Sequence, residues 1–397
     1  MSNYQKIMLL LLVLILFTVV VDYMLLPALS AILLDKLSLS TEAFGTIASA
    51  YGFSAAISSF LAISFIDRFE RKKILLFFYA GFVFGLICCA LSQSFYLLLA
   101  SRVITGISGG LVGAIGLTII ADLFQMNQRG KAMGFIQMAY AIGQIGGLPL
   151  AMYLSSQFSW QVSYLFIIVV GITSWVLLAS IMKRLSDHLA LTREEKPLTH
   201  AINTVGKKRY WFVFGNNIAV VLGDMTLMTF NTVYMTKNLG LSLDQIPLVY
   251  MSIGAVGVAF APLWGKLSDQ LGKVKVFTIG SILSMISLIC YTQMEFYDLW
   301  VVLVLHIILF IGINARMVSS ASLGMSIPEP ADRGTFMTFD ASLQQAAAGF
   351  ASIIAGFLAI TSESGALINF HVIGWIVCTL MLVTILLMWR INQLTIH

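Results

Sequence analysis

Apolar runs long enough to cross a bilayer recur along the whole chain, separated by short polar turns. About 20 apolar residues span the hydrocarbon core, and only a helix satisfies every backbone polar group within one lipid-exposed segment. Charged residues form 10% of this chain, against about 25% in soluble domains. These features predict an all-α membrane protein with twelve spans, at residues 7–29, 43–65, 74–93, 96–120, 131–154, 162–182, 210–235, 246–265, 275–294, 299–323, 335–360 and 368–389.

A charged turn occurs twice and divides the chain into two related halves. The first copy is Asp67-Arg68-Phe69-Glu70-Arg71-Lys72-Lys73, and the second is Gly265-Lys266-Leu267-Ser268-Asp269-Gln270-Leu271-Gly272-Lys273-Val274-Lys275. Asp67 and Asp269 are 202 residues apart (269 − 67), about half of the chain. A repeat of this length implies two similar bundles with the transported solute between them. We predict six-helix bundles over residues 1–185 and 209–397, joined by a cytoplasmic linker at 186–208.

Basic residues are strongly biased toward one side of the predicted membrane. With the N-terminus inside, 19 of the 23 Lys and Arg residues are cytoplasmic, Lys36 and Lys237 are outside, and Arg102 and Arg316 lie within spans. This bias predicts that both termini are cytoplasmic. It also explains the net charge of +5 without a nucleic-acid partner. We expect a multi-pass protein of a bacterial cytoplasmic (inner) membrane, whose partners are the lipid bilayer, protons and a small-molecule substrate.

The second charged turn resembles the loop signature of the major facilitator superfamily. The matching positions are Gly265, Asp269, Gly272 and Lys273, and the first copy keeps the charges Asp67, Arg68 and Arg71. The resemblance implies two pseudo-symmetric six-helix bundles, alternating access and a monomer. An Asp at a helix end also meets an Arg or the exposed amides of another helix favourably. We therefore assign these seven residues to a cytoplasmic gate; solvated charges that only fix topology are the alternative.

Two further segments resemble the drug:proton antiporter branch of that superfamily. Residues 102–106 (Arg-Val-Ile-Thr-Gly) resemble its basic motif, and Gly143, Gly146 and Gly147 with a displaced Pro149 resemble its glycine–proline motif. We expect proton-coupled efflux of a small drug-like or amphipathic organic metabolite, with no cofactor beyond the proton gradient. Proton-coupled uptake of a sugar, amino acid or organic acid is the alternative. The sequence contains no GxxxxGK[ST] loop, metal cluster or nucleophile–base pair, so we expect neither ATP-driven transport nor an enzyme.

Two charged residues in the first half lie at similar depths. A charge at mid-membrane costs about 2.5–3.5 kcal/mol on insertion scales, so it needs a partner or a water-filled cavity. At about 1.5 Å per residue, Asp22 lies ~6 Å and Arg102 ~9 Å outward of the centres of spans 1 and 4. We expect the two to interact, with Asp22 carrying the proton that Arg102 helps to release; a purely structural ion pair is the alternative.

Three charged residues lie within spans of the second half. Arg316 and Asp340 lie ~7 and ~10 Å inward of their span centres, so we expect them to pair. Asp340 would then be a second proton site or the counter-ion of Arg316. Asp224 lies near mid-membrane, with no basic residue identified at its depth, and we assign it to a substrate ammonium or to a second proton.

Uncharged polar groups within the spans are candidates for lining the substrate path. Gln137, Tyr140 and Gln144 fall at i, i+3 and i+7, which places them on one face of span 5. Any one such group could instead join two helices, which is the role expected of His306. The candidates are Tyr23, Gln137, Tyr140, Gln144, Asn217, Asn231, Tyr234, Asn314 and Gln344.

Overall fold

Twelve helices long and apolar enough to cross a membrane are present in the computed structural model, which describes residues 1–186, 202–295, 298–329 and 332–396. The predicted all-α fold with twelve spans is therefore confirmed, with boundaries within a few residues of most expected ones. The elements of the first half are α1 (Asn3–Ala28), α2 (Ser30–Lys36), α3 (Thr41–Phe65), η1 (Ile66–Arg68), α4 (Arg71–Ala90), α5 (Phe95–Leu123), α6 (Met126–Ile142), η2 (Gly143–Gly147), α7 (Leu148–Gln157) and α8 (Trp160–Ile181). Those of the second half are α10 (Tyr210–Val233), η4 (Tyr234–Asn238), α11 (Ile246–Leu271), α12 (Lys273–Thr292), α13 (Leu299–Gly324), α14 (Arg333–Leu358) and α15 (Phe370–Ile396).

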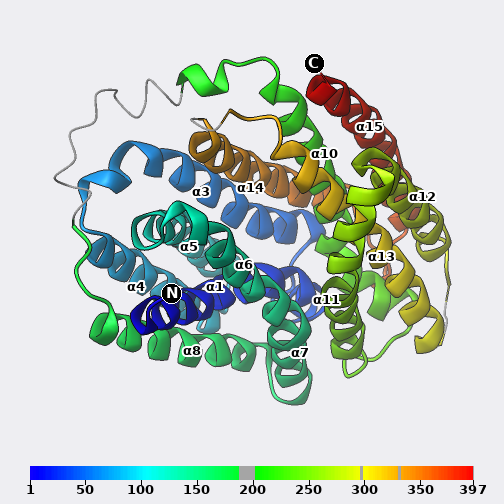
Figure 1. Ribbon diagram of the computed structural model, residues 1–397. Coiled ribbons are helices and arrows are strands. Elements are labelled where there is room, and N and C mark those ends of the chain that lie inside the picture. Colours follow the sequence, from blue (N-terminus) through cyan, green and yellow to red (C-terminus); the bar gives the residue numbers. More distant parts are fainter. Residues whose placement is uncertain (187–201, 296–297, 330–331, 397) are drawn as a thin grey trace.

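The helices form two bundles that meet chiefly along four pairs of elements. Helices α1 to α8 make the first bundle and α10 to α15 the second, as the colours of Figure 1 show. Across the boundary α3 packs on α14, α1 on α10, and η2 with α7 on α11. Most of the predicted linker at 186–208 lies outside the described residues, so the proposed domain division stays a prediction.

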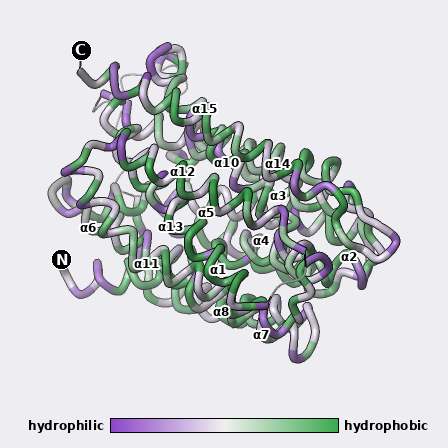
Figure 2. Tube along the Cα trace, turned by 90° about the vertical axis from the view of Figure 1, so that its right-hand side faces the viewer, coloured by the Kyte–Doolittle hydropathy of each residue, from purple (hydrophilic) through white to green (hydrophobic). Residues whose placement is uncertain are grey.

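Local sequence explains where several helices begin. Ser2 precedes α1 and forms a capping box with Gln5, while Ser40 caps α3 through the Ala43 amide. A serine before a helix accepts a hydrogen bond from an otherwise unpaired amide, which favours starting the helix there. Figure 2 shows apolar stretches along the helices and hydrophilic residues mostly near their ends, as a surrounding lipid phase requires.

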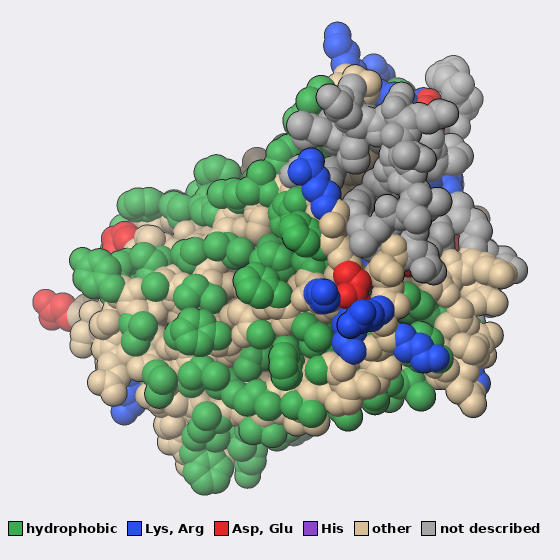
Figure 3. Space-filling model, turned by 90° about the vertical axis from the view of Figure 1, so that its left-hand side faces the viewer, with side chains coloured by type: hydrophobic (Ala, Val, Ile, Leu, Met, Phe, Trp, Pro, Cys, Tyr) green, Lys and Arg blue, Asp and Glu red, His purple; other side chains and the backbone are tan. Residues whose placement is uncertain are grey.

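The two ends of the molecule differ in charge. At one end, the segment after α8 contacts the start of the chain, where the Lys183 amide donates to the Tyr4 hydroxyl. The same segment contacts the start of α4, where the Arg71 amide donates to the Leu185 carbonyl. We call this the basic end, and the end that carries α2 and η4 the opposite end. Figure 3 shows Lys and Arg side chains gathered mostly at one end of an otherwise apolar face.

Two glycines allow the bundles to approach closely. A Cβ atom on Gly52 of α3 would lie 2.7 Å from backbone atoms of Gln345 and Gly349 of α14. A Cβ atom on Gly254 of α11 would lie 2.6 Å from the backbone of Gln144 in η2. Gly52 and Gly254 are 202 residues apart (254 − 52), the spacing of the repeated turn. The α3–α14 and α11–η2 crossings are thus counterparts in the two halves.

Candidate functional site

A buried ion pair joins α1 to α5 in the first bundle. Arg102 Nη1 donates to Asp22 Oδ1 at 2.7 Å, and the two side chains are 1% and 0% exposed. The Arg102 guanidinium also lies over the ring of Tyr51, 4.7 Å from its centroid. Asp22 Oδ2 and Arg102 Nε have no hydrogen-bond partner among the described residues. The structure therefore brings Asp22 and Arg102 together, as their similar depths suggested. One hydrogen-bonding atom of each side chain remains unused among the described residues.

A second ion pair joins α10 to α13, with a carboxylate other than the predicted one. Arg316 Nη1 lies 3.4 Å from Asp224 Oδ1, whereas Asp340 bonds to other residues. The predicted Arg316–Asp340 pair is therefore wrong, and so is the premise that Asp224 has no basic neighbour. Depth along a helix gives no information about which face a residue occupies, which is why Asp340 was chosen in place of Asp224.

The two ion pairs are counterparts under the internal repeat. Asp22 and Asp224 are 202 residues apart (224 − 22), and their arginine partners lie in the fourth span of each bundle. The same spacing separates Asp67 from Asp269, so the sequence contained the signal that the depth estimate missed. Each bundle thus has a carboxylate on its first span paired with an arginine on its fourth.

Asp340 of α14 is held by neutral groups. The Asn217 amide donates to its Oδ1 and Oδ2 at 3.1 and 2.9 Å, and the Gln344 amide donates to Oδ2 at 2.8 Å. Behind Asn217, the Ser320 hydroxyl donates to Asn217 Oδ1 and accepts from the Asn216 amide. The structure therefore brings three of the predicted site residues, Asp340, Asn217 and Gln344, into one hydrogen-bond network.

Several predicted polar residues lie where the bundles meet. The Tyr23 hydroxyl bonds Met225 Sδ of the other bundle at 3.3 Å, beside a cavity of about 20 Å³ that Tyr23 and Arg102 help to line. Such a cavity has room for about one water molecule. Gln144 of η2 and Asn314 of α13 both approach Gly257 of α11. These residues therefore line the boundary between the bundles.

Two further predicted residues lie inside the second bundle, and two lie on α6. Asn231 and Tyr234 are buried within the second bundle, where Asn231 bonds His306 and Tyr291 and Tyr234 bonds the Tyr291 and Met294 carbonyls. In this conformation Asn231 and Tyr234 both connect neighbouring helices by hydrogen bonds. His306 does the same through Asn231, as the sequence predicted for it. Gln137 and Tyr140 are exposed on α6, and Tyr140 is close enough to Tyr23 and Tyr51 to interact with them electrostatically, so it faces the same region as Tyr23.

The predicted gate residues divide into distinct environments. Arg71 is buried and donates to Asp122 of α5 at 2.8 Å and to the Ile66 carbonyl, so it closes contacts within its own bundle. Gly272 adopts φ +95° between α11 and α12, a conformation that favours glycine. Arg68 and Asp269 are exposed, Gly265 and Lys273 are half-buried, and the side chain of Asp67 lies outside the described set.

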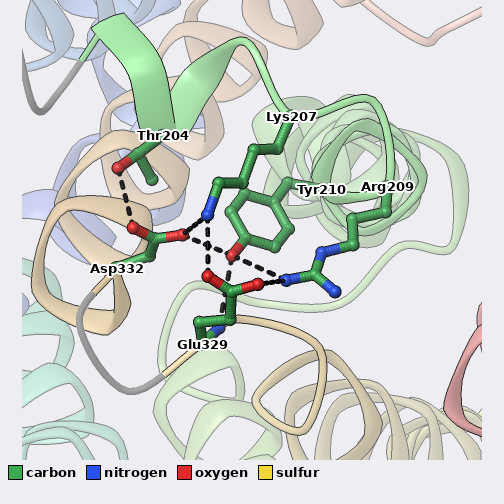
Figure 4. Close-up of polar contacts among 6 residues, drawn as sticks. All are labelled: Thr204, Lys207, Arg209, Tyr210, Glu329 and Asp332. Carbon is green, nitrogen blue, oxygen red and sulfur yellow. Dashed lines mark hydrogen bonds and ion pairs between the residues drawn. The ribbon is translucent and has the colours of Figure 1, made fainter.

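A polar network at the basic end was not anticipated from the sequence. Lys207 Nζ donates to Glu329 Oε2 at 2.8 Å and to Asp332 Oδ2 at 2.7 Å (Figure 4). The Tyr210 hydroxyl donates to Asp332 Oδ2 at 2.6 Å, the Thr204 hydroxyl donates to Oδ1, and Arg209 pairs with Glu329. The network fixes the segment before α10 against the turn between α13 and α14.

Hydrogen bonds in this network shift the proton affinities of its members. Bonds to Asp332 and then Glu329 raise the pKa of Lys207 above its usual value. The bond from Lys207 lowers the pKa of Glu329. Burial of Asp332 would raise its pKa, but the hydrogen bonds from Lys207 and Tyr210 outweigh that effect and hold it below the usual value. All three groups are thus stabilised in their charged forms.

At the opposite end, polar contacts cross between the bundles. Lys237 of η4 donates to Asp35 of α2 at 2.8 Å, and Gln157 donates to Asp244 at 3.1 Å. A cavity of about 130 Å³ between the bundles is lined in part by Asp35, Lys237 and Thr361. Among the residues that the structure describes, no three His, Cys, Asp or Glu side chains are grouped as metal ligands would be.

Comparison with known families identifies this architecture. The sequence profile of the Major Facilitator Superfamily matches residues 11–223 and again residues 213–393. The chain belongs to the Major Facilitator Superfamily. The two matches cover the two bundles in turn, which accounts for the paired ion pairs and paired glycine crossings.

Known transporters and solved structures resemble this chain over half to nearly all of its length. An uncharacterized MFS-type transporter, YceJ of Bacillus subtilis, is 24% identical over 370 residues, 91% of this chain and 92% of that protein. A probable sugar efflux transporter of Helicobacter pylori (strain J99) is 24% identical over 223 residues, 56% of each chain. The D-xylose–proton symporter structure matches with TM-score 0.76 and 18% identity over 98% of each chain.

A bacterial homologue of the human lysosomal transporter Spinster, in an inward-facing and unoccupied conformation, matches with TM-score 0.73 and 17% identity. That alignment covers 100% of this chain and 97% of the solved one. At such identities the solved structures show the fold. Together with the family assignment, they make this chain a major facilitator transporter and not an enzyme.

Proposed function

We propose that this transporter couples proton movement to the efflux of a small drug-like or amphipathic organic metabolite, by alternating access between its two bundles. The observation that carries the proposal is the buried Asp22–Arg102 pair, next to a water-sized cavity at the bundle boundary. A buried pair is held together only while Asp22 is ionised, so protonating Asp22 releases Arg102. That release gives the proton a direct effect on packing between α1 and α5.

The unused bonding capacity of the pair supports this role. A purely structural ion pair in a low-dielectric interior needs its remaining polar atoms satisfied to offset the desolvation cost. Asp22 Oδ2 and Arg102 Nε are both without a partner among the described residues. A water molecule would donate a hydrogen bond to that oxygen, and a proton would remove the charge that makes it costly to bury. The cavity that Arg102 helps to line gives either a place to arrive.

The two ends of the molecule differ in the contacts that close them. The opposite end is closed by contacts between bundles, whereas the ion pair of Arg71 with Asp122 at the basic end joins two helices of the same bundle. We place the basic end, with both chain termini, on the cytoplasmic side of a bacterial inner membrane, because basic residues are retained on that side. We take the working unit to be a monomer, with the two bundles supplying both sides of the path.

Proton-coupled uptake remains the second candidate. The fold is shared with a D-xylose–proton symporter, and a proton carrier on α1 is compatible with either direction. Direction separates the two functions cleanly. In proteoliposomes with an imposed pH gradient, efflux by antiport predicts that a transported compound accumulates against the direction of proton flow. Accumulation in the direction of proton flow would instead establish uptake by symport.

A further inference from the structure

The ionisable residues inside the spans leave one carboxylate without a cation. Asp22 is paired with Arg102 and Asp224 with Arg316, so these four residues carry no net charge. Asp340 is the fifth, and its hydrogen-bond partners are the amides of Asn217 and Gln344. Among the described residues, no Lys, Arg or His lies within ion-pair distance of Asp340. Within the spans, this carboxylate therefore lacks the compensation that the other two have.

The other ionisable groups around Asp340 are already engaged. On α10, which packs against α14, Asp224 lies two turns from Asn217 and is bonded to Arg316 of α13. On α3, Tyr51 lies beneath Arg102 of the first bundle. His306 of α13 bonds Asn231 and the Val302 carbonyl. Among the residues that the structure describes, none supplies a positive charge to balance a charged Asp340.

The network behind Asp340 is rich in acceptors. Asn216 is fully buried and its Oδ1 has no partner among the described residues, although its amide bonds Ser320. Asp340 is only half-buried, so its carboxylate retains access from the space around α14. A half-buried carboxylate that two amides orient favours a ligand that brings positive charge and N–H donors.

We propose that Asp340 is the recognition site for a positively charged, amine-bearing organic substrate, oriented by Asn217 and Gln344. This inference rests on the proposed transport function and names its substrate class. A proton and an ammonium group both neutralise the same carboxylate, so they compete for it. Binding of the amine then displaces a proton from the Asp340 carboxylate. This exchange of a proton for a substrate is what antiport requires.

The test is a binding measurement on the purified full-length protein in detergent, without any gradient. The probes are aryl-alkyl primary amines, such as phenethylamine and longer homologues, each matched by the alcohol of the same shape. Thermal unfolding reports binding, because a ligand that binds only the folded state raises Tm. A pH indicator in weakly buffered solution reports proton release. We expect the amines to raise Tm and release protons, and the alcohols to do neither.

Asp340→Asn should weaken amine binding at least ten-fold and abolish the proton release. The matched control is Asp298→Asn, at an exposed position before α13 with no side-chain capping bond, which should bind as the wild type does. Equal amine binding by Asp340→Asn and the wild type would overturn the assignment of Asp340. Equal stabilisation by amines and alcohols, or none by any amine, would overturn the cationic substrate class.

Two further measurements protect the test from misfolding of the variant. In the wild type, lowering the pH should weaken amine binding by competition, and Asn217→Ala should weaken it while leaving the carboxylate in place. Unchanged affinity at low pH would contradict the competition. No gradient is involved, so amine binding that depends on Asp340 would stand even if transport proved uncoupled from protons. Conversely, failure of Asp340 to bind amines would leave the proposal of proton-coupled transport standing.

Discussion

Asp35 and Lys237 form an ion pair of 2.8 Å between the bundles and are 202 residues apart in the chain. That is also the spacing of the repeated turn, so the two residues occupy equivalent positions in the two halves. Residues related by a two-fold repeat touch each other only near the axis that relates the halves, which runs along the membrane normal. Tyr23 and Met225 share this spacing and also touch, deeper in the membrane.

Charge reversal at this pair should loosen the opposite end. Lys237→Glu places two carboxylates together, whereas the exchange Asp35→Lys with Lys237→Glu restores an attractive pair. Exposed ion pairs are worth about 0.2–1 kcal/mol, so the closed population should fall by up to about five-fold. The measurement is the labelling rate of a single cysteine at Thr361, which lines the cavity beneath the pair, in a background without the four native cysteines. Labelling should be faster in Lys237→Glu than in the exchanged variant. Equal rates in the two variants would show that the Asp35–Lys237 pair does not hold this end closed.

The two glycine crossings should be equally intolerant of a side chain. Gly52→Ala and Gly254→Ala each place a Cβ atom within 2.7 Å of backbone in the other bundle. Overpacking of this kind costs about 1–3 kcal/mol and should separate the bundles at these points. Gly116→Ala is the control, because a Cβ atom there meets nothing within 4 Å. Thermal unfolding checks this: the first two variants should lose stability and the control should not.

The network of Lys207, Glu329 and Asp332 should give a defined pH dependence of stability. The pKa values of the two carboxyls are lowered in the folded protein, so their contribution is present above their ordinary values of 4.5 and 3.8, and is lost as the pH falls through the lowered ones. The raised pKa of Lys207 adds stability that is complete below its ordinary value of 10.5 and disappears as the pH rises through the raised one.

We therefore expect a stability plateau between about pH 5 and pH 10 from this network. Asp332→Asn should lower Tm on the plateau, because it changes the buried acceptor of three hydrogen bonds. It should also reduce the fall of Tm below pH 5 (the acid limb), because it removes a carboxyl whose pKa is lowered by folding. Asp298→Asn, at an exposed position before α13 with no side-chain capping bond, serves as the control. A wild-type acid limb that is retained in full by Asp332→Asn would show that other carboxyls cause it.

Breaking either buried ion pair from one side should be costly. Removing one partner of a buried pair typically costs about 3–5 kcal/mol, because an uncompensated charge stays behind. Arg316→Gln should therefore destabilise the second bundle strongly, and adding Asp224→Asn should recover part of the loss. Adding Asp340→Asn in its place should recover nothing. Recovery by Asp340→Asn would contradict the observed pairing of Arg316 with Asp224.

The fold followed from the sequence because apolar length and charge asymmetry are properties of each segment by itself. The pairing of Asp22 with Arg102 was also accessible, since their depths coincide and the resemblance placed both spans at the centre. The partner of Arg316 was missed because depth does not specify the helix face, although the 202-residue spacing of Asp22 and Asp224 gave the answer. The Lys207 network depends on how a turn folds back on α10, which no periodic pattern encodes.

The proposed role of Asp22 as the proton carrier is tested most directly by Asp22→Asn in proteoliposomes, assayed in two ways with a compound that the wild type moves. Exchange of labelled for unlabelled compound needs only translocation, whereas accumulation under an imposed pH gradient needs the proton. We expect Asp22→Asn to retain exchange and to lose gradient-driven accumulation. Gradient-driven accumulation at the wild-type level, with its pH dependence unchanged, would contradict the role of Asp22 as the proton carrier.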